Sequence, residues 1–201
     1  MIIENWFSIP VYVSDITGDT LSSIQQELTI AYDDLLINNE FQPHTLTKSH
    51  LLSDPTFSTN LLDTYSTDFF KNTLTTHVLN YMKLIDSNIG NARSLDYNIS
   101  GSWMTLNQEN SYAFVHTHND SDISGVYYYK TNSDDGNLFF STPNKLMTSS
   151  YCFNHHNQAV DYTPVVGRII LFPGWLEHGV RTNLTTNERV SVSFNINFKR
   201  N

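Results

Sequence analysis

The segment HTHND, residues 116–120, carries two imidazoles and one carboxylate at alternate positions. In an extended strand, His116, His118 and Asp120 would project from the same face, because strand side chains alternate with a period of two. Imidazole nitrogens and carboxylate oxygens are common protein ligands of divalent transition metals. The segment is therefore either a polar surface turn or a strand that gathers metal ligands on one face.

A second group of candidate residues lies in FPGWLEHGV and RVS. His178 follows an apolar run and a Pro-Gly turn, and Arg189 and Ser191 begin the last strand-like segment. Strand–loop–strand geometry can bring the starts of successive strands together, so these residues could share one cavity with HTHND. The planar fork of an arginine pairs with a carboxylate through two hydrogen bonds.

Such a set of side chains supports a specific chemistry. Two histidines and one carboxylate on one side of an iron ion leave coordination positions open. A bidentate keto acid and O2 can fill those positions, and the far carboxylate of the keto acid then needs a buried cation such as Arg189.

The first half of the chain is predicted to support this set. FSIPVYVSD has the pattern of a short leading strand. Residues 19–38 and 60–85 carry apolar side chains three and four positions apart, which predicts two amphipathic helices.

After residue 95 the apolar period changes to two, which indicates strands. SGVYYYKT and LFFSTP flank an Asp135-Gly136 pair that predicts a hairpin turn. VVGRIILFP has the length of a buried strand. Residues 189–198 alternate apolar side chains with arginine, serines and asparagines, which favours a strand that lines a polar cavity. We expect an antiparallel sandwich or barrel such as a jelly roll, with helices packed on one side.

Length and composition narrow the classes of protein. The 201 residues fit one domain, in which residues 1–95 supply the leading strand and helices and residues 96–201 the β core. A formal net charge of −9 argues against bulk nucleic-acid binding. The single cysteine, Cys152, cannot form an internal disulfide. Without a signal peptide or an apolar run that could span a membrane, we expect a cytoplasmic protein.

Three segments resemble one protein family: HTHNDSDISGVYYYK, GRIILFPGWLEHGV and ERVSVSFNINF. They are similar to 2-oxoglutarate/Fe(II)-dependent oxygenases of a type common in phages and marine bacteria, which is distantly related to prolyl 4-hydroxylases. The resemblance spans nearly the whole chain and is strongest from Trp103 to Phe198. It implies a double-stranded β-helix (jelly roll, cupin-like) core that holds Fe(II) and 2-oxoglutarate.

The resemblance also implies the ligands, with one alternative open. Either His118 and Asp120 bind iron together with His178, or His116 takes the place of Asp120, because family members often show H-x-H here. Spacing does not choose between them, since all three positions of HTHND share strand parity. We predict no catalytic residue beyond the metal ligands.

The cofactor site implied by the resemblance contains Arg189 and Ser191, which would bind the far carboxylate of 2-oxoglutarate. Asn107, Tyr127 and Tyr129 are further candidates for its binding, and Tyr112 is a candidate to line the same cavity. His155 and His156 read as a solvated or substrate-facing loop.

The predicted activity is hydroxylation of an unidentified substrate by O2, with release of succinate and CO2. A protein side chain is the favoured substrate, ahead of a nucleobase or a small metabolite, and a homodimer is compatible with the sequence. The expected location is the cytoplasm of a bacterium or of a phage-infected cell.

Two other classes of protein compete with this prediction. A cupin-like metal enzyme without 2-oxoglutarate would use three histidines but would give Arg189 no purpose. A non-enzymatic β-sandwich, such as a virion protein or a binding module, would have no tight metal site.

Overall fold

The computed structural model describes residue 2 and residues 8–43, 47–54, 56, 59–85, 96–146 and 159–199, without the side chains of residues 47–50. The predicted boundary near residue 95 lies outside the described residues. So do Cys152 and the pair His155 and His156.

Within these described ranges, ten strands form one antiparallel sheet. They are β1 (Tyr12–Asp15), β2 (Gln42–Pro43), β3 (Thr47–Leu52), β4 (Tyr97–His116), β5 (Ile123–Lys130), β6 (Leu138–Ser141), β7 (Ala159–Tyr162), β8 (Arg168–Pro173), β9 (His178–Val180) and β10 (Arg189–Phe198). Their order is β1-β8-β5-β10-β4-β9-β6-β7, and β3 joins the sheet through β4 and carries β2.

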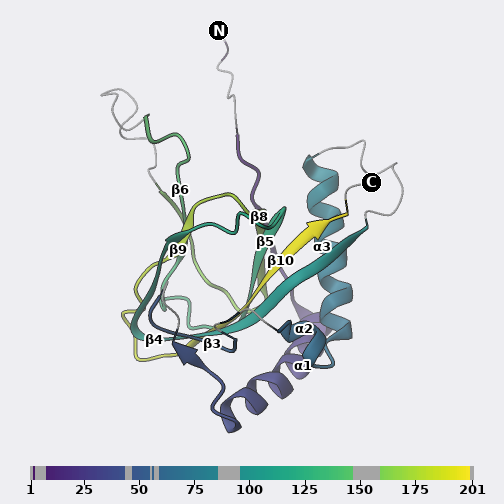
Figure 1. The fold of residues 1–201 in the computed structure, drawn as a ribbon, viewed down its shortest axis with the longest axis vertical. Helices are drawn as coiled ribbons and strands as arrows, with labels where there is room; N and C mark the ends of the chain where they lie inside the picture. The colour runs from purple at the N-terminus through teal and green to yellow at the C-terminus, as the bar shows by residue number, and fades with distance from the viewer. Residues whose placement is uncertain are drawn as a thin grey trace.

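The long strand β4 lets the sheet curl. Its first part pairs with β10, whereas its end pairs with β9. One strand of 20 residues therefore belongs to both halves of the sheet, and the sheet is curled, with a concave side (Figure 1). The predicted mainly β architecture is confirmed.

The helices α1 (Gly18–Ile37), α2 (Leu61–Thr64) and α3 (Asp68–Ile85) lie together on one side of the sheet (Figure 1). The single helix predicted for residues 60–85 is thus two helices. The interruption comes at Tyr65, which is extended, and Thr67 Oγ1 then donates a hydrogen bond to the carbonyl of Leu62. Threonine hydroxyls compete in this way with the helical hydrogen bonds of the backbone.

The core lies between the helices and the sheet. Buried apolar side chains of α1 and α3, such as Leu28 and Phe70, pack against the apolar face of β10, which includes Val192 and Phe194. Each fully buried side chain of this kind contributes about 1.5–3 kcal/mol. Because these residues lie on one face of the central strands, the opposite face forms the concave side of the sheet.

The hairpin predicted at Asp135-Gly136 is wrong. The turn is present, with Gly136 at φ 97° and the Asp135 carboxylate accepting hydrogen bonds from Thr131 Oγ1 and the Asn132 amide. However, β5 pairs with β8 and β10, and β6 pairs with β7 and β9. The turn therefore carries the chain from one half of the sheet to the other.

The amino end of α3 depends on a side chain from α1. Glu27 accepts hydrogen bonds from the backbone amides of Phe69 and Phe70, both at 2.9 Å. We expect Glu27→Ala to lower the free energy of unfolding by about 1–2 kcal/mol, because two helix-terminal amides lose their acceptor. Urea unfolding would measure this loss. Asp33→Ala, which removes an exposed carboxylate of the same helix, should change stability by less than about 0.5 kcal/mol. Equal effects of the two variants would contradict the capping role.

Candidate metal and cofactor site

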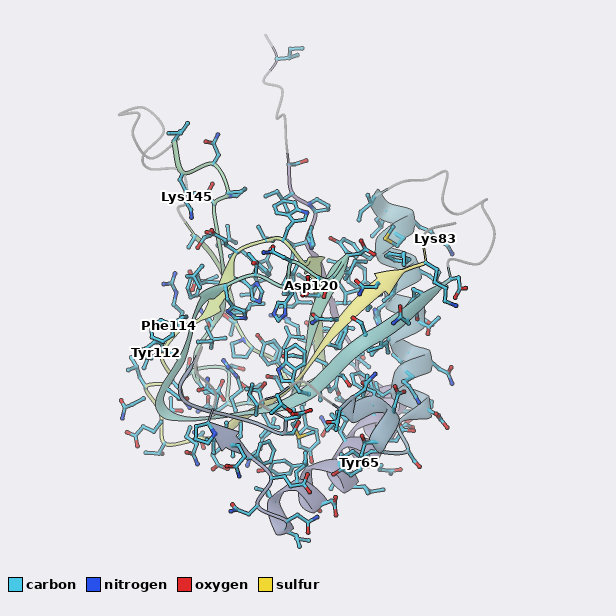
Figure 2. All side chains as sticks on the ribbon, viewed as in Figure 1. Tyr65, Lys83, Tyr112, Phe114, Asp120 and Lys145 are labelled. Carbon is cyan, nitrogen blue, oxygen red and sulfur yellow. The ribbon has the colours of Figure 1, made fainter. Side chains whose placement is uncertain are left out.

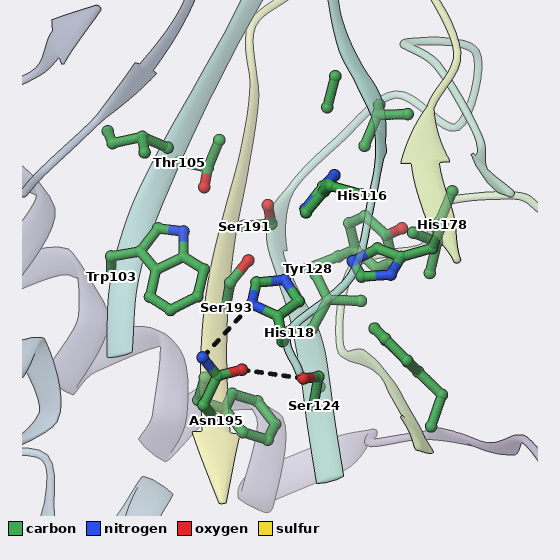
Figure 3. A pocket seen from close by; sticks show the side chains of 18 of the residues that line it. Trp103, Thr105, His116, His118, Ser124, Tyr128, His178, Ser191, Ser193 and Asn195 are labelled. Carbon is green, nitrogen blue, oxygen red and sulfur yellow. Dashed lines mark hydrogen bonds between the residues drawn. The ribbon is translucent and has the colours of Figure 1, made fainter. Parts of the chain in front are cut away.

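A cavity of about 170 Å³ lies on the concave side of the curled sheet. Strands β4, β5, β9 and β10 contribute most of its wall (Figure 3). The predicted polar face of the last strand is confirmed as part of this wall, through Arg189, Ser191, Ser193 and Asn195. Sequence reasoning therefore identified the correct face of β10.

Three histidines meet in this cavity. His116 ends β4, His118 follows it, and His178 begins β9. A potential ligand atom from each ring lies within 4.8 Å of the other two. The ring centroid of His116 is 4.4 Å from that of His178, and the ring of His118 is 5.1 Å from both.

A β-bulge directs His116 into the cavity. Ala113 pairs with Val180 and His116 pairs with His178, so β4 uses three steps where β9 uses two. The extra residue reverses the side-chain alternation. As a result Ala113 and His116 both line the cavity, whereas Phe114 and Val115 are exposed.

Two of the three rings are oriented by backbone carbonyls. Nδ1 of His116 lies 2.7 Å from the carbonyl oxygen of Phe114, and Nδ1 of His178 lies 2.8 Å from that of Leu176. A carbonyl oxygen only accepts, so each Nδ1 carries the proton and donates it. With the proton on Nδ1, Nε2 of each ring carries the lone pair that a metal binds.

The third ring is held differently. The His118 backbone amide donates to the Gly174 carbonyl at 2.8 Å, which ties the HTHND segment to the turn between β8 and β9. Nδ1 of His118 lies 3.4 Å from Nδ2 of Asn195, and the Trp103 ring lies 5.7 Å away on the cavity wall (Figure 3).

Burial keeps His118 and His178 neutral. Burial first, and the nearby His116 second, lower the pKa of His178 to about 3 and that of His118 to about 4. Neutral imidazole is the form that binds metal, so near neutral pH protons compete little for these two rings.

Asp120 lies apart from the three histidines. Its side chain is exposed in the turn that follows His118 (Figure 2). It is not among the residues that line the cavity, nor in the group of potential metal ligands. The shared parity expected for HTHND does not extend to Asp120, because the strand ends at His116.

Arg189 lines the cavity at the other end of β10 from Asn195, whereas Asn107, its neighbour on β4, is not among the lining residues. They face each other in the register of β10 and β4, and they are 2% and 0% exposed. Arg189 Nη1 donates to the carbonyls of Asp135 and Gly136. Within the described part of the chain, its Nε and both polar side-chain atoms of Asn107 have no hydrogen-bond partner. Unpaired buried polar atoms are costly, so this pair indicates a polar ligand.

The tyrosines expected beside the cofactor lie elsewhere. Tyr127 packs in the core against Phe70, at 4.8 Å between ring centroids, and the Tyr129 hydroxyl bonds Thr29 of α1 at 2.8 Å. Both are on the helix side of β5, whereas Tyr128 lines the cavity.

The reason is the strand register. Tyr128 pairs with Ser191 of the polar face of β10, and Tyr127 pairs with Val192 of its apolar face. Tyr112 packs edge-on against the exposed Phe114 on the outer side of β4, away from the cavity lining (Figure 2). A run of three tyrosines does not show which side chain faces the cavity. Only the pairing of β5 with β10 identifies Tyr128 as that residue.

Residues 101–195 match a protein family model described as "Putative 2OG-Fe(II) oxygenase". The matched range includes all three histidines and the Arg189–Ser191 segment. The predicted family resemblance, the enzyme class and the two cofactors, Fe(II) and 2-oxoglutarate, are confirmed by this match. No curated protein sequence matches the chain.

Solved structures of the same fold are distant in sequence. A Pseudomonas putida prolyl-4-hydroxylase is 14% identical, with a TM-score of 0.59 over 96% of this chain and 94% of its own. HygX from Streptomyces hygroscopicus with nickel, 2-oxoglutarate and hygromycin B bound is 12% identical, with a TM-score of 0.59 over 94% and 82%.

The epimerase SnoN from nogalamycin biosynthesis is 10% identical, with a TM-score of 0.63 over 94% of this chain and 78% of its own. At these identities the likeness shows the fold alone, and it confirms the predicted jelly-roll core. Among the described residues, no helix is long and apolar enough to span a membrane.

The tie between HTHND and the β8–β9 turn predicts an effect of Gly174→Ala. A Cβ at Gly174 would overlap the Ser121 carbonyl and lie 2.7 Å from the His118 carbonyl. The displaced His118 should weaken Ni(II) binding at least ten-fold, as measured by calorimetry, at a stability cost of about 1–3 kcal/mol. Gly101→Ala is the matched control, because a Cβ there meets nothing within 4 Å. Unchanged Ni(II) affinity in Gly174→Ala would contradict the tie.

The lowered pKa values predict how stability depends on pH when a chelator removes metal. Below about pH 6.5 the unfolded chain binds protons at His118 and His178, whereas the folded protein binds them only near their lowered pKa values of about 4 and about 3. The free energy of unfolding should therefore fall as the pH drops from 6.5 toward 4, by at most about 1.4 kcal/mol per unit and per histidine. Urea unfolding at several pH values measures this slope. His118→Gln should flatten it, and parallel slopes for variant and wild type would contradict the assignment.

Proposed function

We propose that the chain, whose residues 101–195 match the 2OG-Fe(II) oxygenase family model, is a 2-oxoglutarate/Fe(II)-dependent oxygenase that holds iron through His116, His118 and His178. The observation that carries this choice is the convergence of the three rings in one cavity. Asp120 is exposed and outside that group, so His116 is the better third ligand. Two of the rings already have Nδ1 bonded to a carbonyl, which suits Nε2 to a metal.

Arg189 is our proposed partner of the far carboxylate of 2-oxoglutarate. The guanidinium is buried, and among the described residues it makes no ion pair. A buried cation is stabilised by an anion that fits its planar fork. Ser191 lies two residues further along β10, on the same face and the same cavity wall. Its hydroxyl can donate to the same carboxylate.

Asn107 completes this end of the proposed cofactor site. Its amide lies opposite Arg189, and both its nitrogen and its oxygen need partners. Tyr128 takes the place that we expected for Tyr127 and Tyr129, because it lines the cavity. Its ring centroid lies 5.9 Å from Cζ of the Arg189 guanidinium.

When bound, iron and 2-oxoglutarate together supply the oxidation of a C–H bond by O2, with succinate and CO2 as by-products. The protein's own residues hold and shield the reactants. The three neutral histidines leave coordination positions open, Arg189 orients the keto acid, and apolar residues such as Phe172 and Leu138 exclude water from the wall beside His178.

The first substrate class that we propose is a protein side chain. Two structures of the same fold are prolyl hydroxylases, one of them from Trichoplax adhaerens in complex with a peptide fragment of hypoxia inducible factor. A cytoplasmic location and a homodimer are also part of this proposal.

Anaerobic titration tests the cofactor site directly. Fe(II) followed by 2-oxoglutarate should give the wild-type protein the visible charge-transfer band of an iron–keto acid chelate. His178→Ala should abolish the band. Arg189→Ala should retain iron but raise the Kd of 2-oxoglutarate about 30- to 150-fold, equivalent to about 2–3 kcal/mol. Arg181→Ala, which removes an exposed arginine paired with Asp161, is the matched control and should change neither.

Other outcomes separate the competing classes. Iron binding without any band, together with indifference to Arg189→Ala, would favour a cupin-like metal enzyme that uses three histidines. Failure of the wild type to bind Fe(II) at all would favour a non-enzymatic binding module.

A further inference from the structure

The three histidines differ in what faces Nδ1. His116 and His178 each have a backbone carbonyl opposite Nδ1, at 2.7 and 2.8 Å. His118 has a side chain there instead, the amide of Asn195, whose Nδ2 lies 3.4 Å away (Figure 3). The partner of His118 can therefore present either a donor or an acceptor.

The sense of this hydrogen bond decides whether Nε2 of His118 can bind a metal. When Asn195 donates to Nδ1, the neutral ring carries its proton on Nε2 and has no lone pair there. A metal on Nε2 requires the proton on Nδ1, and that proton then needs an acceptor. The Asn195 side-chain oxygen becomes that acceptor when the amide turns by 180°.

Ser124 makes both orientations of the amide possible. Its hydroxyl donates to Oδ1 of Asn195 at 2.9 Å, and Ser124 is 2% exposed (Figure 3). A hydroxyl both donates and accepts, so it can accept from Nδ2 after the turn. The register of β10 on β5, in which Asn195 and Ser124 are paired, holds the two side chains together.

We propose that Asn195 is a positioning residue that selects the metal-binding tautomer of His118 by rotating its amide against Ser124. This inference rests on the proposed function, because it concerns the same three-histidine site. It gives Asn195, which lines the cavity from β10, a role that is separate from the binding of 2-oxoglutarate. Rotation of one amide converts the third ring from a tautomer that cannot bind metal through Nε2 to one that can.

Calorimetric titration with Ni(II), without 2-oxoglutarate, tests the requirement for an acceptor. Asn195→Leu has no polar atom and should weaken Ni(II) binding at least ten-fold. Asn195→Asp keeps an acceptor opposite Nδ1 and should bind Ni(II) within three-fold of wild type or more tightly. Asn197→Asp is the matched charge control, because Asn197 Oδ1 only accepts from the Asp122 amide, at 3.1 Å, and its replacement should leave the affinity unchanged.

Two results of this titration would overturn the proposal. Asn195→Leu that binds Ni(II) like the wild type would show that no acceptor is needed. Asn195→Asp that loses as much affinity as Asn195→Leu would show that the amide nitrogen matters and not the oxygen. A wild type that binds no Ni(II) would instead refute the metal site of the proposed function, and this inference with it.

Nitrogen NMR of histidine-labelled protein reads the tautomer itself. In chelator, His118 should carry its proton on Nε2 in the wild type and on Nδ1 in Asn195→Asp. With Zn(II), a diamagnetic probe, both proteins should show a protonated Nδ1. A protonated Nδ1 in the wild type under both conditions would contradict the rotation, even if the variants change Ni(II) affinity as expected.

Discussion

The alternation of side chains along β10 is the constraint on which the rest of the structure depends. Val190, Val192, Phe194 and Ile196 are fully buried, most of them against the helices, and Arg189, Ser191, Ser193 and Asn195 line the cavity. A slip of one residue would exchange these two sets of side chains. The apolar core on one face therefore fixes the position of every polar group on the other, and the site inherits its geometry from the packing of α1 and α3.

The bulge in β4 and the end of that strand determine which side chains of HTHND can act together. Strict alternation would place His116, His118 and Asp120 on one face, but the alternation is broken at Ala113–His116 and stops at His116. The tie of His118 to Gly174 then returns one ring to the cavity, while Asp120 turns outward. The proposed choice of three imidazoles thus follows from local backbone geometry.

Much of this arrangement could be predicted from the sequence, because it depends on period. The strand at residues 189–198, the helix near residues 19–38 and the joint cavity of His178 and Arg189 follow from apolar spacing and chain order. The errors arise where a local pattern has no period. A run of three tyrosines does not show which one faces inward, and Asp135-Gly136 marks a turn without showing which strands it joins. Whether the helical pattern of residues 60–85 is interrupted depends on the Thr67 hydroxyl.

Charge links the two ends of the cavity. The chain has a formal net charge of −9, yet no Asp or Glu is among the described residues that line the cavity, and Arg189 is buried in its wall. A ligand set with a carboxylate would cancel one positive charge beside the metal, whereas three neutral imidazoles cancel none. With a divalent metal and a doubly charged keto acid bound, the guanidinium would leave the cavity with one positive charge. Before the keto acid binds, the metal and the guanidinium together carry three positive charges, and their attraction for the keto acid strengthens as the dielectric falls. Burial of Arg189 and the proposed choice of three histidines therefore act in the same direction.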